Sequence, residues 1–365
     1  MPASGPLGLK GDLARDAIIR TCASGLPARE LFEQVGARLR TLVPYAAAGW
    51  LSTDPATMLY TDAVVENVDG SLHLEFFENE LVAPDFAKFG ELVRRPERVA
   101  ILSEATDGEP ERSARHRRLH RPHGLSGELR AVFSTGGTCW GVACLTRHEG
   151  ERDFTRDEAA FVGSLCDHVA YGLRTSLLLA AVEEAPPAGA PGMVVLGADG
   201  AVESISAQAE ALLAELESGW LELPTPVHAV ALRARHAGTE EERGVPRSRV
   251  ATRSGRWLVL HATRLHDKAG GSERVAVMIE PARRAELASL VVELYELSER
   301  EQQVTQLLVR GLAIDEIAAA LWLSRHTVRD HVKAIFGKVG VASRPELTAK
   351  LFAEHFLPAM EQPAP

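Results

Sequence analysis

The first part of the chain, which we place at residues 12–183, mixes helix-like and strand-like patterns. Apolar positions three or four residues apart predict an opening helix, at Leu31, Val35, Leu39 and Leu42. Strand-like runs follow at residues 46–52 and 72–77. Two more runs, at 130–133 and 139–145, flank a Ser-Thr-Gly-Gly turn and predict a hairpin. Helices beside an antiparallel sheet indicate an α+β domain.

A single long helix is predicted to close this part of the chain. Thr155-Arg156-Asp157-Glu158 is a Thr-x-x-Glu capping box, in which two side chains satisfy free backbone N–H groups at the start of a helix. The apolar side of the predicted helix holds Phe161, Leu165, Val169, Leu173 and Leu177.

A smaller α+β domain is predicted at residues 193–281, after a Pro/Gly/Ala-rich linker at 183–192. Its first hairpin turns at Asp199-Gly200, a dipeptide that favours tight turns. The predicted elements are strands at 193–196 and 201–206, a helical run with Leu212, Leu213 and Leu216, and a second hairpin of strands at 256–265 and 274–279.

A helical connector is predicted at residues 282–296. One stripe of it is apolar, with Leu287, Leu290, Val291 and Leu294. This pattern fits a helix that packs on its own domain. It equally fits a connector that carries a signal and pairs with its copy in a dimer, and the pattern does not decide between them.

The last domain, at residues 297–357, has the densest helix signals in the chain. Ser298-Glu299-Arg300-Glu301 is a capping box that begins a helix, and Gly311 is suited to end it. A short second helix spans Asp315 to Leu321, and Ser324 caps a third helix that runs to about Val339. Another Ser-x-x-Glu box, at Ser343, opens a fourth helix. Helix, three-residue turn and helix is the helix-turn-helix layout.

The third helix separates an apolar side from a polar side. Val328, Val332, Ile335, Phe336 and Val339 share one arc. Arginine and lysine can donate to guanine O6 and N7 in the major groove of DNA, and aspartate can accept from cytosine. Hydroxyl and ammonium groups at the flank can hold phosphates. We therefore expect a DNA-binding site at Ser324, His326, Thr327, Arg329, Asp330, Lys333 and Lys338.

Charge is concentrated where this site is expected. The whole chain carries a formal charge of −10, so it does not coat nucleic acid non-specifically. Residues 324–350 nevertheless hold six Lys or Arg against two Asp or Glu. The alternative is a solvated helix face that touches nothing, but the caps, turn and apolar register favour DNA.

Targeting and cofactor signals are missing from the sequence pattern. No apolar run approaches the ~20 residues that span a bilayer, and the first residues lack a signal-peptide pattern. We therefore expect a cytoplasmic protein with no membrane contact. We expect no metal, no cofactor and no catalytic residues. His116, His120 and His123 lie among arginines, which indicates a solvated basic loop rather than a metal site.

Two further candidate sites in the residues before the C-terminal domain are weak. Cys139 and Cys144 should face opposite sides of one strand and pack as small core residues. A haem site at His228, His236 and His261 is conceivable in a cup-shaped domain but is not favoured. No receiver domain, phosphate-binding glycine loop or Gly-x-Ser-x-Gly elbow is present in the sequence.

Residues 297–356 resemble the LuxR-type (GerE-like) helix-turn-helix domain of bacterial transcription regulators. The resemblance rests on Leu297-Ser298-Glu299-Arg300-Glu301, Glu316-Ile317-Ala318, Thr327-Val328-Arg329-Asp330-His331-Val332 and Lys338-Val339-Gly340-Val341. It implies a four-helix fold whose third helix enters the major groove. It also implies base-reading positions at Arg329, Asp330 and Lys333, phosphate contacts at Thr327 and Lys338, and a dimer contact through Leu347, Leu351 and Phe352.

The earlier domains resemble sensor modules. Residues 124–130, 139–145 and 154–158 are similar to a GAF-type domain in actinobacterial regulators that end in a LuxR-type domain. Residues 193–281 resemble a PAS-type domain more weakly. The resemblance implies an α+β multidomain protein with a GAF-like sensor, a PAS-like middle domain and a C-terminal all-α domain. Both front domains would bind an unidentified small molecule or build the dimer.

The sequence therefore predicts a sequence-specific transcription regulator. Its expected partners are double-stranded DNA, RNA polymerase at promoters and a second copy of the chain. Two alternatives belong to other classes. One is an enzyme that uses the C-terminal domain only for targeting, for which no converging acid, base or nucleophile is visible. The other is an interaction module whose C-terminal helices bind RNA polymerase rather than DNA.

Overall fold

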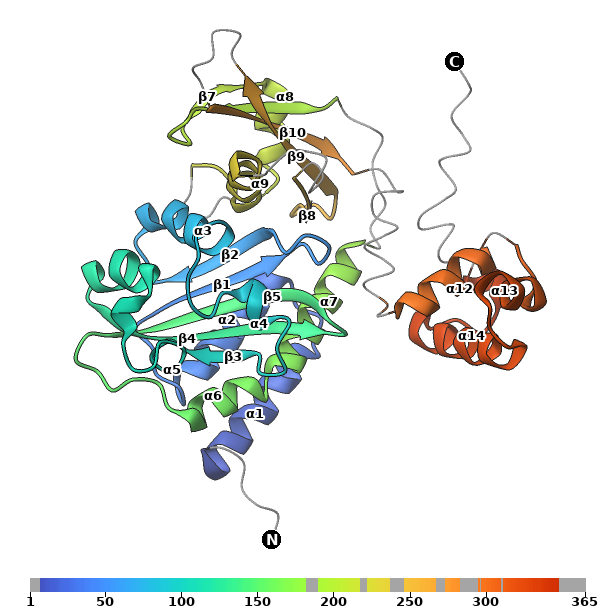
Figure 1. Cartoon of the computed structure of the whole chain (residues 1–365), viewed down its shortest axis with the longest axis horizontal. Coiled ribbons are helices and arrows are strands. Elements are labelled where there is room, and N and C mark those ends of the chain that lie inside the picture. Colours follow the sequence, from blue (N-terminus) through green and yellow to red (C-terminus); the bar gives the residue numbers. More distant parts are fainter. Residues whose placement is uncertain are drawn as a thin grey trace. The chain divides into compact units, whose positions relative to one another are not determined.

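The computed structural model describes residues 7–181, 190–216, 222–236, 246–266, 273–282, 295, 297–309 and 311–347. The chain forms two compact units, Met1–Pro281 and Ala282–Pro365. We refer to them as the front unit and the C-terminal unit. The front unit holds two antiparallel sheets of five strands each, and the C-terminal unit is helical (Figure 1). The predicted α+β class of the front segments is confirmed.

The first sheet has the strand order β2-β1-β5-β4-β3. Its strands are β1 (Ala47–Thr53), β2 (Tyr60–Glu66), β3 (Val99–Ile101), β4 (Leu125–Thr135) and β5 (Thr138–His148). The predicted hairpin is the β4–β5 pair, and it turns at Gly136 and Gly137, which both have positive φ. Glycine adopts that conformation without the steric penalty of a Cβ atom.

Helices cover both faces of this sheet. One face packs on α2 (Ala28–Arg40), α6 (Arg156–Gly163) and α7 (Cys166–Ala181), and α1 (Gly8–Cys22) packs on α2 and α7 (Figure 1). The spacing read from the sequence is correct for α2, because Leu31, Val35 and Leu39 are buried. Short segments lie elsewhere around the sheet: η1 (Gly70–Leu72), α3 (His73–Leu81), α4 (Phe89–Leu92), α5 (Leu102–Ala105), η2 (Pro110–Arg112), η3 (His116–His120) and η4 (Arg121–His123).

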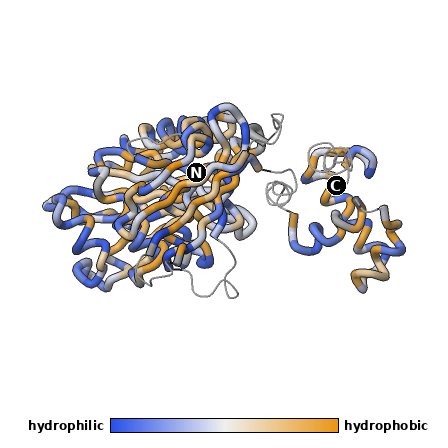
Figure 2. Tube along the Cα trace, turned by 90° about the horizontal axis from the view of Figure 1, so that it is seen from above, coloured by the Kyte–Doolittle hydropathy of each residue, from blue (hydrophilic) through white to orange (hydrophobic). Residues whose placement is uncertain are grey.

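The second sheet has the order β7-β6-β10-β9-β8. It is built from β6 (Gly192–Leu196), β7 (Val202–Ile205), β8 (Arg247–Ala251), β9 (Trp257–His266) and β10 (Glu273–Pro281), with helices α8 (Ala207–Leu213) and α9 (Thr225–His236). Both predicted hairpins form, and Gly200 has the positive φ that the first turn requires. In Figure 2, hydrophobic positions gather along the strands in the middle of the front unit.

The two sheets belong to one packed unit. A single hydrophobic cluster includes Leu51 and Phe77 near the first sheet and Val227 and Leu258 near the second. A buried ion pair adds a specific link, because Arg249 donates from its backbone N–H and its guanidinium to Asp54, each at 2.7 Å. The side chains of Asp54 and Arg249 are 1% and 4% exposed. This pair fixes β8 against the end of β1.

Two predictions about helices and strands were wrong. Residues 72–77 were predicted as a strand but lie in η1 and α3. The run is too short for periodicity to separate strand from helix, and Phe76, Phe77, Glu80 and Leu81 have helical spacing. The single long helix after Thr155 is also divided, into α6 and α7. The hydroxyl of Ser164 donates to the carbonyl of Phe161 at 2.7 Å and so competes with the helical backbone at the break.

Candidate nucleic-acid interface

The C-terminal unit places three helices around a small apolar core. They are α12 (Glu299–Val309), α13 (Ile314–Leu321) and α14 (Arg325–Val339). The core includes side chains that are at most 3% exposed: Val304, Leu308, Ile317, Val328, Ile335, Val339 and Leu347. These three predicted helices are confirmed, and residues 344–347 are helical where the fourth was predicted to begin.

Capping interactions hold the ends of these helices. At the start of α12, Ser298 Oγ accepts from the Glu301 N–H at 3.3 Å and Glu301 Oε2 accepts from the Ser298 N–H at 2.6 Å. Ser324 Oγ accepts from the Thr327 N–H at 3.0 Å and so begins α14. Each bond satisfies an N–H that the helix itself leaves free. The turn before α14 contains Trp322, with φ of 57° and a side chain that is 94% exposed.

The polar side of α14 is open to solvent. Four exposed residues lie along it, and we call them the reading face: His326, Arg329, Asp330 and Lys333. The opposite side of the helix is buried in the core. Asp330 is engaged within the helix, because its Oδ2 lies 3.0 Å from Nδ1 of His326. Arg329 and Lys333 are one helical turn apart, so their side chains project in the same direction.

Lys338 has a partner inside the protein. Its Nζ donates to Glu301 Oε2 at 2.7 Å, the same oxygen that caps α12. Burial alone would raise the pKa of Glu301, but the hydrogen bonds from Lys338 and Ser298 outweigh it and lower that pKa. The Lys338 side chain is 38% exposed. This bond therefore ties α14 to α12. Thr327 also has a partner inside the protein, because its hydroxyl lies 2.8 Å from that of Ser324.

The residues expected at a dimer contact are only partly described. Leu347 is 0% exposed within its own chain, so its side chain belongs to the core of the C-terminal unit. Ser343 Oγ accepts from the Glu346 N–H at 3.3 Å, as the capping box predicts. Leu351 and Phe352 lie outside the described residues, as does most of the connector at 282–296.

The basic segment around His116 is not the solvated loop that the sequence indicated. Arg115 is 0% exposed, and its Nε and Nη2 atoms donate to the Glu128 carboxylate at 2.9 and 2.8 Å. Residues His116–His120 form one turn of π-helix, with both histidines buried. A second buried arginine, Arg130, donates to Glu128 at 3.2 Å. We call the group the buried charge cluster: Arg115, Arg130, Glu80, Asp85 and Glu128.

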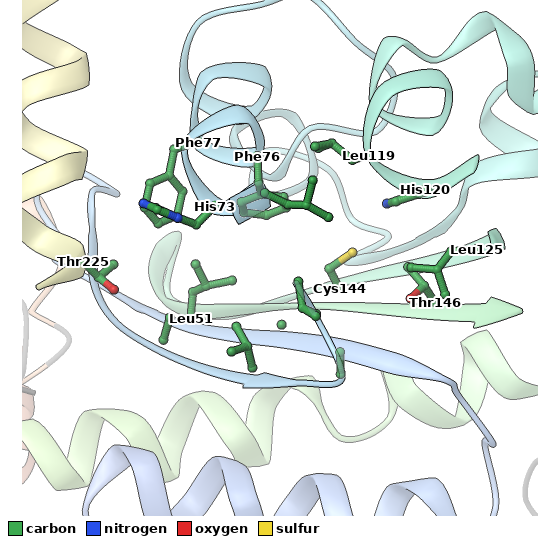
Figure 3. A pocket seen from close by; sticks show the side chains of 16 residues that line it. Leu51, His73, Phe76, Phe77, Leu119, His120, Leu125, Cys144, Thr146 and Thr225 are labelled. Atoms are coloured by element: carbon green, nitrogen blue, oxygen red, sulfur yellow. The ribbon is translucent and has the colours of Figure 1, made fainter. Parts of the chain in front are cut away.

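A small cavity lies beside the buried charge cluster. Its volume is about 100 Å³, and its walls come from the first sheet, α3, the π-helical turn and the start of α9 (Figure 3). Most of the lining is apolar. His120 and Cys144 contribute polar atoms at one side, and Thr225 contributes one from α9.

Metal binding at this place is not supported by the contacts. His120, Glu128 and Cys144 offer ligand atoms within 4.8 Å of one another. However, Glu128 Oε1 already accepts from Arg115, Arg130 and the Cys144 thiol. Burial and the adjacent carboxylate raise the pKa of Cys144 well above its usual value, so the thiol keeps its proton. Local sequence patterns do not reveal this grouping, because the π-helical turn and the pairing of β4 with β5 bring its members together.

The cysteines and the other histidines that the sequence analysis considered, all of them described residues, do not come together at one site. Cys139 and Cys144 are both buried, as expected. The ring of His228 faces that of His73 at 5.0 Å between centroids, His236 is exposed, and Nε2 of His261 lies 3.5 Å from Glu280. Within the part of the chain that the structure describes, no helix has the length and hydropathy of a membrane span.

Comparison with known proteins relates the C-terminal unit to a family of regulators. The family described as "Bacterial regulatory proteins, luxR family" matches residues 295–351. A putative HTH-type transcriptional regulator of Aeromonas salmonicida is 44% identical over 63 residues, which cover 17% of this chain and 32% of that protein. The transcriptional regulatory protein UhpA of Escherichia coli is 43% identical over 56 residues, 15% of this chain and 29% of that protein. This chain thus spans about a third of the length of these relatives.

The solved structures are more distant. The match to the GAF domain of a phosphoenolpyruvate-protein phosphotransferase from Coxiella burnetii covers 48% of this chain and 98% of that domain, at 17% identity and a TM-score of 0.35. The match to Escherichia coli SdiA covers 94% of this chain and 97% of the SdiA chain, at 13% identity and a TM-score of 0.31.

A shorter relative is matched over most of its own length. The spore germination protein GerE of Bacillus subtilis is 38% identical over 55 residues, which are 15% of this chain and 74% of that protein. The family match at residues 295–351 includes the three helices and the reading face described above. Through its C-terminal unit, the chain belongs to the luxR family of bacterial regulatory proteins.

Proposed function

We propose that this protein is a sequence-specific DNA-binding transcription regulator in which the front unit senses a signal or builds a dimer. The observation that carries the proposal is the reading face of α14. Its cationic side chains are exposed, while the opposite side of the helix is buried in the core. A rigid helix with exposed Arg and Lys suits the width and the acceptor pattern of the DNA major groove.

Within this proposal, six of the seven residues of the predicted site have a defined task. Arg329 and Lys333 donate to base edges. Asp330 accepts from a base once its contact with His326 opens. Ser324 and Thr327 stand at the start of α14, where backbone N–H groups and hydroxyls favour a phosphate. Lys338 reaches a phosphate only at the expense of its bond to Glu301, so we expect its main contribution to be structural.

The wider roles follow from the family and are proposals for the whole chain. We propose a cytoplasmic homodimer that acts at promoters together with RNA polymerase and has no catalytic activity of its own. The negative charge of the chain outside the C-terminal unit disfavours non-specific DNA contacts, so binding would depend on the reading face.

Selection from random duplex DNA tests this proposal. The purified full-length protein, without RNA polymerase, should enrich one sequence and protect it from nuclease digestion. A dimer should enrich a site with two related halves about one helical turn apart. Protection that requires RNA polymerase would support the interaction-module alternative and contradict our proposal.

A further inference from the structure

The cavity in the front unit has apolar walls. It lies between the first sheet and α3, and Figure 3 shows the side chains that face it. The strand side supplies Leu51 and Val65, and the helical side supplies Phe76, Phe77 and Leu119. An apolar cavity of about 150 Å³ in another protein stays dry and binds benzene. At about 100 Å³ the present cavity is smaller, so it suits at most a single small ring or a short chain.

His120 gives this cavity one polar position with no internal partner. The residue is 6% exposed, and a nitrogen of its ring faces the cavity (Figure 3). Its Nδ1 atom is buried without a hydrogen-bond partner among the described residues. Its Nε2 atom lies 3.9 Å from Glu128 Oε1, which is beyond hydrogen-bond distance. The ring nitrogen that faces the cavity can bond to a ligand there, and such a bond recovers part of the cost of burying a polar ring.

The charge state of the surroundings selects a neutral ligand. Burial lowers the pKa of His120 to about 4, so at neutral pH the ring offers one N–H donor and one acceptor. Glu128 stays ionised, because Arg115, His120 and Arg130 lower its pKa although burial alone would raise it. An anionic ligand would meet that carboxylate, and a cation would find the carboxylate already bonded to two arginines. A hydroxyl both donates and accepts, and it satisfies either tautomer of the ring.

We propose that this cavity binds a small neutral alcohol or phenol, whose apolar body lies against Phe76 and Phe77 and whose hydroxyl bonds to His120. The inference rests on the sensory role proposed above and names the chemical class of the signal. Occupancy of the cavity also reaches the second sheet. Thr225 of α9 lines the cavity, and His73 on α3 faces His228 on α9 with 5.0 Å between ring centroids. A ligand under α3 therefore acts directly on the contact between the two halves of the front unit.

Calorimetric titration of the full-length protein with phenol, n-butanol and toluene tests the proposal. Toluene has the shape of phenol without the hydroxyl. We expect phenol to bind at least about tenfold more tightly than toluene, since one buried polar atom gains a partner only with phenol. Absence of binding by both hydroxyl compounds, or equal affinity for phenol and toluene, overturns the proposal.

Two variants locate the binding. His120→Phe keeps a ring but removes both nitrogens, and it should bring the phenol and toluene affinities within about threefold of each other. Gly49→Ile fills the cavity from β1, because a Cβ atom at Gly49 meets only Leu51 Cδ1 at 3.8 Å. It should weaken both ligands at least about tenfold. His148 is exposed, so the variant His148→Phe serves as the control and should change neither affinity.

These titrations measure ligand binding in the absence of DNA, so the cavity proposal and the regulator proposal can fail independently. Phenol binding by a protein that selects no DNA sequence would contradict the regulator proposal alone. Sequence selection by a protein that binds none of the hydroxyl compounds would contradict the cavity proposal alone. Phenol binding that is unaffected by Gly49→Ile and His120→Phe, in variants with wild-type circular dichroism, would place the ligand elsewhere and overturn the assignment.

Discussion

The double variant Arg329→Ala/Lys333→Ala should lose specific DNA binding while it keeps its fold. Each side chain that donates to base edges contributes about 1–3 kcal/mol of discrimination. Removing both should weaken binding to the selected site by about thirtyfold or more. Both residues are exposed and lie opposite the buried side of α14, so the melting temperature should stay within about 2 °C of wild type. Fluorescence anisotropy with the selected duplex measures the affinity.

The control for this experiment removes a cation from a different helix. Arg300 is exposed on α12 and donates to Gln303 at 2.7 Å, away from the reading face. Arg300→Ala should change the affinity less than about threefold, since it removes no base contact and only long-range charge attraction. A double variant that binds the selected duplex as tightly as wild type would contradict the assignment of the reading face.

Replacing Arg115 with Met should destabilise the front unit strongly. Arg115 is fully buried and donates to Glu128, to Asn79 Oδ1 at 3.1 Å and to the Phe86 carbonyl at 3.2 Å. Its loss leaves the buried Glu128 carboxylate with one fewer arginine. Removing one partner of a buried ion pair costs about 3–5 kcal/mol. Urea unfolding followed by circular dichroism should show a reduction of that size in the unfolding free energy.

Two further variants separate burial of charge from loss of side-chain packing. Arg118 is exposed in the same π-helical turn, and Arg118→Met should change the unfolding free energy by less than about 0.5 kcal/mol. In the double variant Arg115→Met/Glu128→Gln the carboxylate is also removed, so the loss should be smaller than the sum of the two single losses. Strictly additive losses would show that the two residues do not stabilise each other.

Local signals in the sequence predicted the C-terminal unit well. The boxes at Ser298 and Ser343 and the cap at Ser324 act within three residues, so the sequence contains all of each interaction. The buried side of α14 also followed from simple helical spacing. The bond between Lys338 and Glu301 was missed, because it joins residues 37 positions apart and nothing in either helix alone indicates it.

Long-range pairing explains what the sequence did not reveal in the front unit. Strand β2 was missed, because its burial alternates only weakly and its pairing with β1 is a tertiary contact. The segment around Arg115 reads as a solvated basic loop until Glu128 and Asp85 are seen to converge on it. The cavity likewise joins β1, β2, α3 and the π-helical turn, which no local pattern relates.

The most direct test of the account is a scan of the selected duplex with purines that lack N7. Each guanine and adenine is replaced in turn by its 7-deaza analogue, which keeps Watson–Crick pairing but removes an acceptor from the major groove. We predict that at least one position in each half-site lowers the affinity of the full-length protein by about tenfold or more, and that Arg329→Ala abolishes this sensitivity. Wild-type affinity at every substituted purine would contradict reading of base edges by α14.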